Sequence, residues 1–160
     1  MKTVSNAAWY EMASCCLVVS MPANAARFTY TYVGQPYTIF SPTQKNCYKP
    51  AMHLGFTVVL DQRLPRNAQT LAPVKRWTVS DGRARSFHGK GGAFEAFTDA
   101  KGVIVKWLWR ISIGDPVTYF AVTDTLGGEN SPVEDLVLNN MCKVESMASN
   151  LSDPGAWTGP

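Results

Sequence analysis

Basic side chains concentrate in the middle of this chain, around a segment that reads as a β-hairpin. Seven lysines and arginines lie between positions 63 and 90, and Asp81 is the only acidic residue among them. Asp81-Gly82 is a strong signal for a tight turn between two strands, and alternate residues of a strand share one face. Arginine forks match carboxylates, phosphates and sulfates, so we predict an anion-binding face on this hairpin. Its predicted residues are Arg76, Arg83, Arg85, His88 and Lys90.

The partners that such a face would meet outside a cell are acidic polysaccharide, lipopolysaccharide and extracellular nucleic acid. Single-stranded nucleic acid also needs aromatic side chains beside the cations, on which its bases stack. Trp77 and Phe87 are candidates by position, although packing in the core explains both more simply. The alternative is a solvated face, or one paired with the acidic end of the same molecule, where seven acids and one base follow position 114.

The sequence lacks the motifs of the common catalytic and metal sites. Its two histidines, His53 and His88, do not have the His-x-His or His-Glu-x-x-His spacing of a zinc site. No Gly-x-Ser-x-Gly elbow occurs, and the glycines around Lys90 lack the spacing of a phosphate loop. We therefore predict no catalytic residue, no metal and no cofactor.

A small secreted hydrolase is the second hypothesis, because paired carboxylates meet in space and leave no fixed spacing in a sequence. Its acids would come from the region between positions 115 and 135. The candidates are Asp124, Glu129, Glu134 and Asp135. Loop acids are more often simply solvated, and no Asp-x-Asp-x-Asp-Gly calcium loop is present.

The first 25 residues have the pattern of a secretory signal peptide. Lys2 supplies a positive start, residues 12–21 are mostly apolar, and Ala23-Asn24-Ala25 has the small-x-small pattern of a cleavage site. A membrane-spanning helix needs roughly twenty apolar residues, so this stretch is too short to be one. We expect a periplasmic or secreted protein with one domain, residues 26–160.

Cys47 and Cys142 are the two cysteines that would remain after cleavage. An even pair in an exported chain predicts one disulfide, and two separate buried thiols are the alternative. Neither cysteine belongs to a Cys-x-x-Cys motif, so neither redox catalysis nor zinc binding is indicated.

Hydrophobic residues recur with a period of two along most of the chain, which is typical of strands with one buried face. One such stripe is Leu54, Phe56, Val58 and Leu60, and the longest is Val103, Val105, Trp107, Trp109, Ile111 and Ile113. Short strands separated by turn residues predict an all-β fold, an antiparallel sandwich or open barrel. Residues 132–148 fit a short C-terminal helix and a strand equally well, because a helix start at Ser131-Pro132 is followed by Leu136-Val137-Leu138, which could equally be a short buried strand.

Four segments together resemble a known family. Residues 28–38 (FTYTYVGQPYT) resemble a YTYTGNPFT opening, and residues 77–82 (WTVSDG) resemble an FSFSDG hairpin. Residues 97–107 (FTDAKGVIVKW) resemble STDASGNITAW, and residues 148–157 (ASNLSDPGAW) resemble a closing ASNSSPGTW. In this order they are similar to a family of secreted bacterial all-β proteins, many with a PEP-CTERM sorting tail. The resemblance implies an exported all-β domain and adds no catalytic residue.

No proline-glutamate-proline motif follows Trp157, so we do not expect sorting to the cell surface by that route. The preferred hypothesis is a non-catalytic module of the bacterial envelope or its surroundings. A hydrolase and a purely structural surface protein are the alternatives, and the sequence makes no prediction of oligomeric state.

Overall fold

In the part of the chain that the computed structural model describes, all regular secondary structure consists of antiparallel strands. Eleven strands form a strongly curled sheet there, and no helix occurs among the described residues. The predicted all-β class is confirmed. The predicted signal peptide lies outside the described residues, which are 26–83, 86–114, 119–125, 134–139, 141–142, 145–150 and 155–160.

The strands follow one another along the chain with short connections. Their bounds are β1 Phe28–Pro36, β2 Ile39–Ser41, β3 His53–Leu60, β4 Gln69–Ser80, β5 Ser86–Gly89, β6 Ala93–Thr98, β7 Ile104–Ile113, β8 Tyr119–Asp124, β9 Glu134–Asn139, β10 Ser146–Asn150 and β11 Ala156–Thr158.

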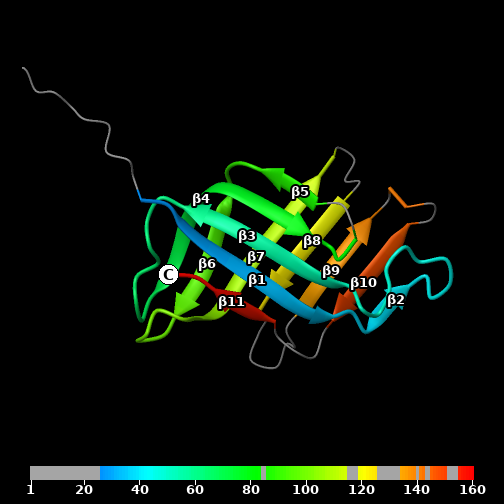
Figure 1. Cartoon of the computed structure of the whole chain (residues 1–160), viewed down its shortest axis with the longest axis horizontal. Coiled ribbons are helices and arrows are strands. Elements are labelled where there is room, and N and C mark those ends of the chain that lie inside the picture. Colours follow the sequence, from blue (N-terminus) through cyan, green and yellow to red (C-terminus); the bar gives the residue numbers. More distant parts are fainter. Residues whose placement is uncertain are drawn as a thin grey trace, which may run out of the picture.

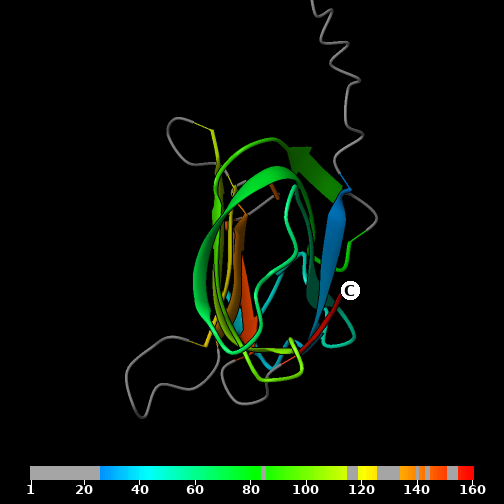
Figure 2. The ribbon, with the colours of Figure 1, turned by 90° about the vertical axis from the view of Figure 1, so that its left-hand side faces the viewer.

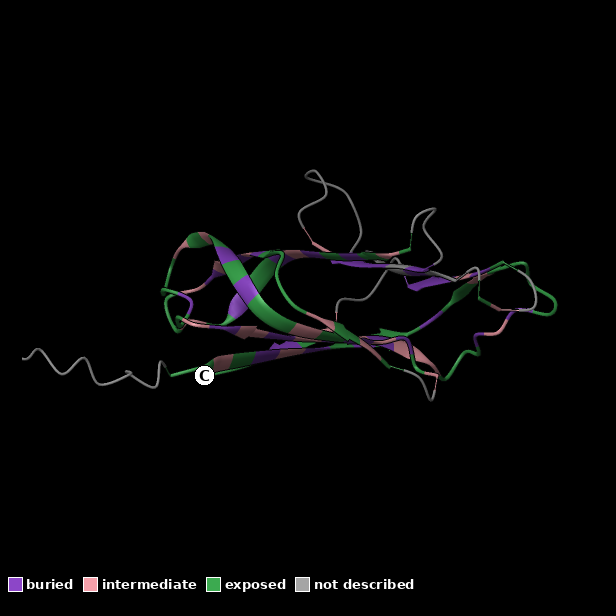
Figure 3. Cartoon of the chain, turned by 90° about the horizontal axis from the view of Figure 1, so that it is seen from above, coloured by how far each residue is buried: buried purple, intermediate pink, exposed green. Residues whose placement is uncertain are grey.

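The strands lie in two facing layers that share the long strand β4 (Figures 1 and 3). Residues 69–73 of β4 pair with β6, and residues 74–80 pair with β3. Figure 2 shows β4 curving from one layer to the other. The first layer contains β11, β1, β3 and β5, and the second continues through β6, β7, β8, β9, β10 and β2. The core lies between these layers.

The core is built from the alternating residues that the period of two predicts. The stripe on β3 is confirmed, since Leu54, Phe56, Val58 and Leu60 are all buried. Tyr32 packs between Trp107 and Trp157, with ring centroids 5.3 Å and 5.2 Å away. These aromatic side chains join strands from both layers, and burying such large rings is a major source of stability.

The predicted stripe on β7 is wrong at its beginning. Trp107, Trp109 and Ile111 are buried, but Val103 and Val105 are 50% and 52% exposed. The register explains the difference, because Phe97 pairs with Lys106 whereas the next residue, Thr98, pairs with Ile104. One extra residue in β7 forms a bulge, and a bulge changes which residues point inward. Ile104 is buried instead.

Of the two alternatives for residues 132–148, the structure has the strand, since residues 134–139 lie in β9 and residues 146–148 in β10. β9 pairs with β8 on one side and with β10 on the other. A segment that is paired along both edges satisfies its backbone polar groups in the sheet. Pairing with β8 and β10 therefore determines the structure of this segment, despite the helix-start signal in its local sequence.

The predicted disulfide is present between Cys47 and Cys142, whose Cα atoms are 6.2 Å apart. It links the loop before β3 to the connection between β9 and β10. Such a bond is typical of an oxidising, extracytoplasmic environment. Within the described residues, no helix has the length and apolar character needed to cross a bilayer.

Tyr119→Phe is expected to leave stability at neutral pH unchanged or to raise it by up to about 1 kcal/mol, because an unsatisfied buried hydroxyl costs free energy. Tyr119 is buried against Phe87, with ring centroids 4.3 Å apart, and its hydroxyl has no hydrogen-bond partner in the described structure. Phenylalanine keeps the ring contact. Denaturant unfolding at pH 7 measures the difference.

The same substitution should flatten the alkaline limb of the stability curve. Burial raises the pKa of Tyr119 above its ordinary value, and the nearby Asp81 carboxylate adds to the shift. Above pH about 10 the unfolded chain releases this proton while the folded chain keeps it, so stability falls as pH rises. An equal fall in the variant and the wild type between pH 9 and pH 11 would contradict this assignment.

Candidate functional site

The predicted hairpin is formed by β4 and β5. Ser80 pairs with Ser86 and Thr78 pairs with His88, so the two strands run antiparallel from the Asp81-Gly82 turn. Gly82 has a positive φ of 82°, and a Cβ there would lie 2.5 Å from the Cβ of Met52. The turn thus requires glycine for its backbone conformation and for space.

Arg76, His88 and Lys90 come together on the outer surface of this hairpin. His88 lies opposite Thr78, and Arg76 lies two residues from Thr78 on the same face of β4. Lys90 follows directly after β5. All three side chains are exposed, and neither Arg76 nor Lys90 forms an ion pair with another described residue. The charges of Arg76 and Lys90 are therefore exposed to a ligand.

Arg83 occupies a different environment. Its Nε and Nη2 donate to Oδ2 of Asp81 at 3.0 Å and 2.9 Å, and its guanidinium lies over the ring of Tyr48. Asp81 is fully buried and also accepts a hydrogen bond from the Tyr48 hydroxyl at 2.9 Å. The charge of Arg83 is therefore neutralised inside the protein, and we place it outside the candidate site. Arg85 lies outside the described residues.

Two adjoining hollows meet at Trp77 and Lys90. The first, of about 400 Å³, is lined by Arg76, Trp77, Thr78, His88, Gly89 and Lys90. The second, of about 260 Å³, continues past Lys90 along the glycine-rich connection to β6 and reaches Arg110 on β7. No acidic residue is among the described residues that line either hollow. The region suits an anion, because none of these described lining residues carries a negative charge.

The aromatic residues of the hairpin face the interior. Phe87 packs on Tyr119, as the core explanation predicts. Trp77 is half-buried, and a Cβ at Gly89 would lie 2.4 Å from its Cζ2, so the indole rests against the backbone of β5. Only the remaining part of this ring borders the hollows.

The acids of the hydrolase hypothesis are largely beyond what the structure describes. Asp115 and Glu129 lie outside the described residues. Asp124 is half-buried at the end of β8, where the backbone register pairs it with Glu134. Among the described side chains, no group of three His, Cys, Asp or Glu residues is arranged to hold a metal ion.

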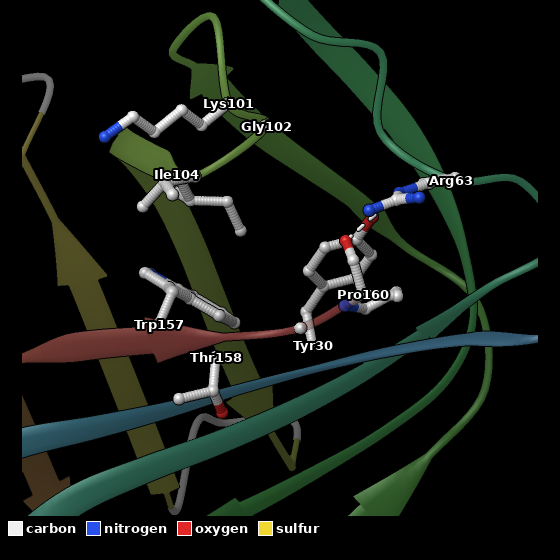
Figure 4. Close-up of a pocket in the computed structure, with 10 residues that line it drawn as sticks. Tyr30, Arg63, Lys101, Gly102, Ile104, Trp157, Thr158 and Pro160 are labelled. Carbon is white, nitrogen blue, oxygen red and sulfur yellow. Dashed lines mark hydrogen bonds between the residues drawn. The ribbon is translucent and has the colours of Figure 1, made fainter.

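A third hollow, which the sequence did not suggest, opens between β11 and the connection from β6 to β7 (Figure 4). It has a volume of about 270 Å³, and its cationic side chains are Arg63 and Lys101. In Figure 4 they lie on opposite sides of the hollow, with Tyr30 and Trp157 below. Arg63 Nε already donates to the carbonyl oxygen of Pro160 at 3.1 Å. Its lining comes from segments far apart in the chain, so no local pattern could reveal it.

The loop that carries Lys101 is held by Asp99. Oδ1 of Asp99 accepts backbone hydrogen bonds from Lys101 at 2.8 Å and from Val103 at 2.9 Å. The bond from Val103 contributes most to holding the pKa of Asp99 below its ordinary value. Gly102 takes the positive φ of 88° in this turn, which glycine adopts without steric cost.

No family model matches the chain, and neither the curated proteins nor the solved structures include a match. The family resemblance drawn from the four sequence segments therefore stays a prediction.

Proposed function

We propose that this chain is a non-catalytic extracytoplasmic module that binds an anionic polymer over β4 and β5. The observation that carries the proposal is the grouping of Arg76, His88 and Lys90 on one exposed face, beside hollows whose described lining residues include no acid. Several cations on one face attract a polyanion through many weak contacts, which suits an extended ligand. The disulfide supports a location in which such polymers occur.

A hydrolase has less support. A glycosidase needs two carboxyl groups held across one bond, one of them with a raised pKa. Asp124 is the only one of the four candidate acids whose side chain is described, so the described side chains show no pair of these carboxyl groups. We therefore assign no catalytic role.

Reversing two charges is expected to weaken binding strongly. The double variant Arg76→Glu, Lys90→Glu should lose at least ten-fold in affinity for alginate, because two attractive contacts become repulsive. Fluorescence anisotropy with labelled alginate at about 50 mM salt measures this, and wild-type binding should weaken steeply towards about 500 mM, where screening shortens the range of the field.

The matched control is Lys49→Glu, Lys106→Glu. It changes the net charge by the same amount at two exposed lysines outside both hollows. A control that loses as much affinity as the test variant would mean that net charge alone drives binding. Arg83 is avoided because its reversal would break the buried pair with Asp81.

A further inference from the structure

Four threonines and His88 form one straight row across the outer surface of the first layer. The strand register pairs Thr158 with Thr31, Thr31 with Thr57, Thr57 with Thr78, and Thr78 with His88. Each pair joins neighbouring strands, so the row crosses β11, β1, β3, β4 and β5. Strands are spaced by about 4.8 Å, which makes the row roughly 19 Å long.

The row lies on a surface composed mainly of threonine, serine, valine and glycine. All five side chains are exposed or half-buried, and Thr31 Oγ1 lies 3.4 Å from Thr57 Oγ1. One neighbouring row contains Thr29, Val59 and Arg76, and the other contains Val33, Gly55, Ser80 and Ser86. None of these described positions carries an acid, a tryptophan, a tyrosine or a phenylalanine.

This surface chemistry favours sugars over bases. A threonine hydroxyl donates one hydrogen bond and accepts others, which matches the hydroxyls of a polysaccharide. A single-stranded nucleic acid depends on aromatic rings that stand free for stacking. On this hairpin Phe87 packs on Tyr119 and Trp77 rests against Gly89, so neither ring stands free on the threonine row.

We infer that the bound polymer is a carboxylate-bearing polysaccharide that crosses the strands along the threonine row and ends against the cations of β4 and β5. This inference rests on the proposed function. The charge of the ligand is complementary to Arg76 and Lys90, and its hydroxyls contact Thr57 and Thr78 along the row beside these cations.

The test replaces hydroxyls and leaves the charges in place. In the full chain, Thr57→Val, Thr78→Val removes two hydroxyls while the β-branched shape suited to strands is kept. We expect its affinity for labelled alginate to fall about ten-fold and its affinity for a labelled oligothymidylate to stay unchanged. The control is Thr38→Val, at an exposed threonine between β1 and β2 and outside the row; it should keep wild-type affinity.

The outcomes separate this inference from the proposed function. Suppose that Thr57→Val, Thr78→Val binds alginate like the wild type while Arg76→Glu, Lys90→Glu binds much more weakly. The role of the threonine row is then wrong, and the proposed anion-binding face is supported. Tighter binding of oligothymidylate than of alginate would overturn the inference that the ligand is a polysaccharide, and it would still support the proposed anion-binding face. If neither polymer binds at low salt, both proposals fail. Thermal unfolding of each variant verifies that it is folded.

Discussion

Replacing Cys47 and Cys142 with serine is expected to lower the free energy of unfolding by about 4–5 kcal/mol. The two residues are 95 positions apart, and in the chain-entropy model a cross-link over so long a loop restricts the unfolded chain by this amount. Urea unfolding of the double variant and the wild type measures the difference. The loss should appear mainly as a lower midpoint.

A reducing agent supplies the control for this prediction. It should shift the wild type to the midpoint of the serine variant and leave the variant itself unchanged. Loss of the disulfide should also loosen the contact below it, since Arg83 Nη1 lies 3.6 Å from Cys142 Sγ. A serine variant as stable as the oxidised wild type would contradict the stabilising role.

Asp81→Asn is expected to destabilise the protein by about 3 kcal/mol, because removing one partner of a buried pair leaves the other charge uncompensated. The Asp81 side chain is fully buried and that of Arg83 is 22% exposed, so solvent relieves only part of the loss. The substitution also weakens the acceptor of the Tyr48 hydroxyl. Thermal or urea unfolding measures the effect.

Asp61→Asn is the matched control for this prediction. Asp61 binds Lys75 at 2.8 Å, a distance similar to that of the buried pair, but these side chains are 40% and 57% exposed. Exposed pairs contribute about 0–1 kcal/mol. Equal losses in the two variants would show that burial does not decide the strength of the Asp81–Arg83 pair.

The sequence predicts the interior of this protein better than its surface chemistry. Burial on one face of a strand imposes a period of two, which Leu54, Phe56 and Val58 display directly. The same rule fails at Val105, because a bulge depends on how β7 meets β6 and leaves no local mark. Residues 134–139 form a strand because their backbone groups hydrogen-bond to β8 on one side and to β10 on the other. A helix-start signal in the local sequence carries no information about these distant partners.

In the candidate site, too, features set by the local sequence were predictable and features set by distant contacts were not. The turn at Asp81-Gly82 and the alternation of strand faces were enough to group His88 with Arg76. Arg83 differs because Tyr48, far away in the sequence, closes over its guanidinium. The threonine row could not be predicted from the sequence, since Thr158 lies next to Thr31 only because the last strand pairs with the first.

The sharing of β4 between the two layers has a consequence for cooperativity. Residues 69–73 hold one layer and residues 74–80 hold the other, within a single continuous strand. Neither layer can lose this strand without exposing the inner side of both. We therefore expect the two layers to unfold cooperatively, and a destabilising substitution anywhere along β4 should destabilise both layers.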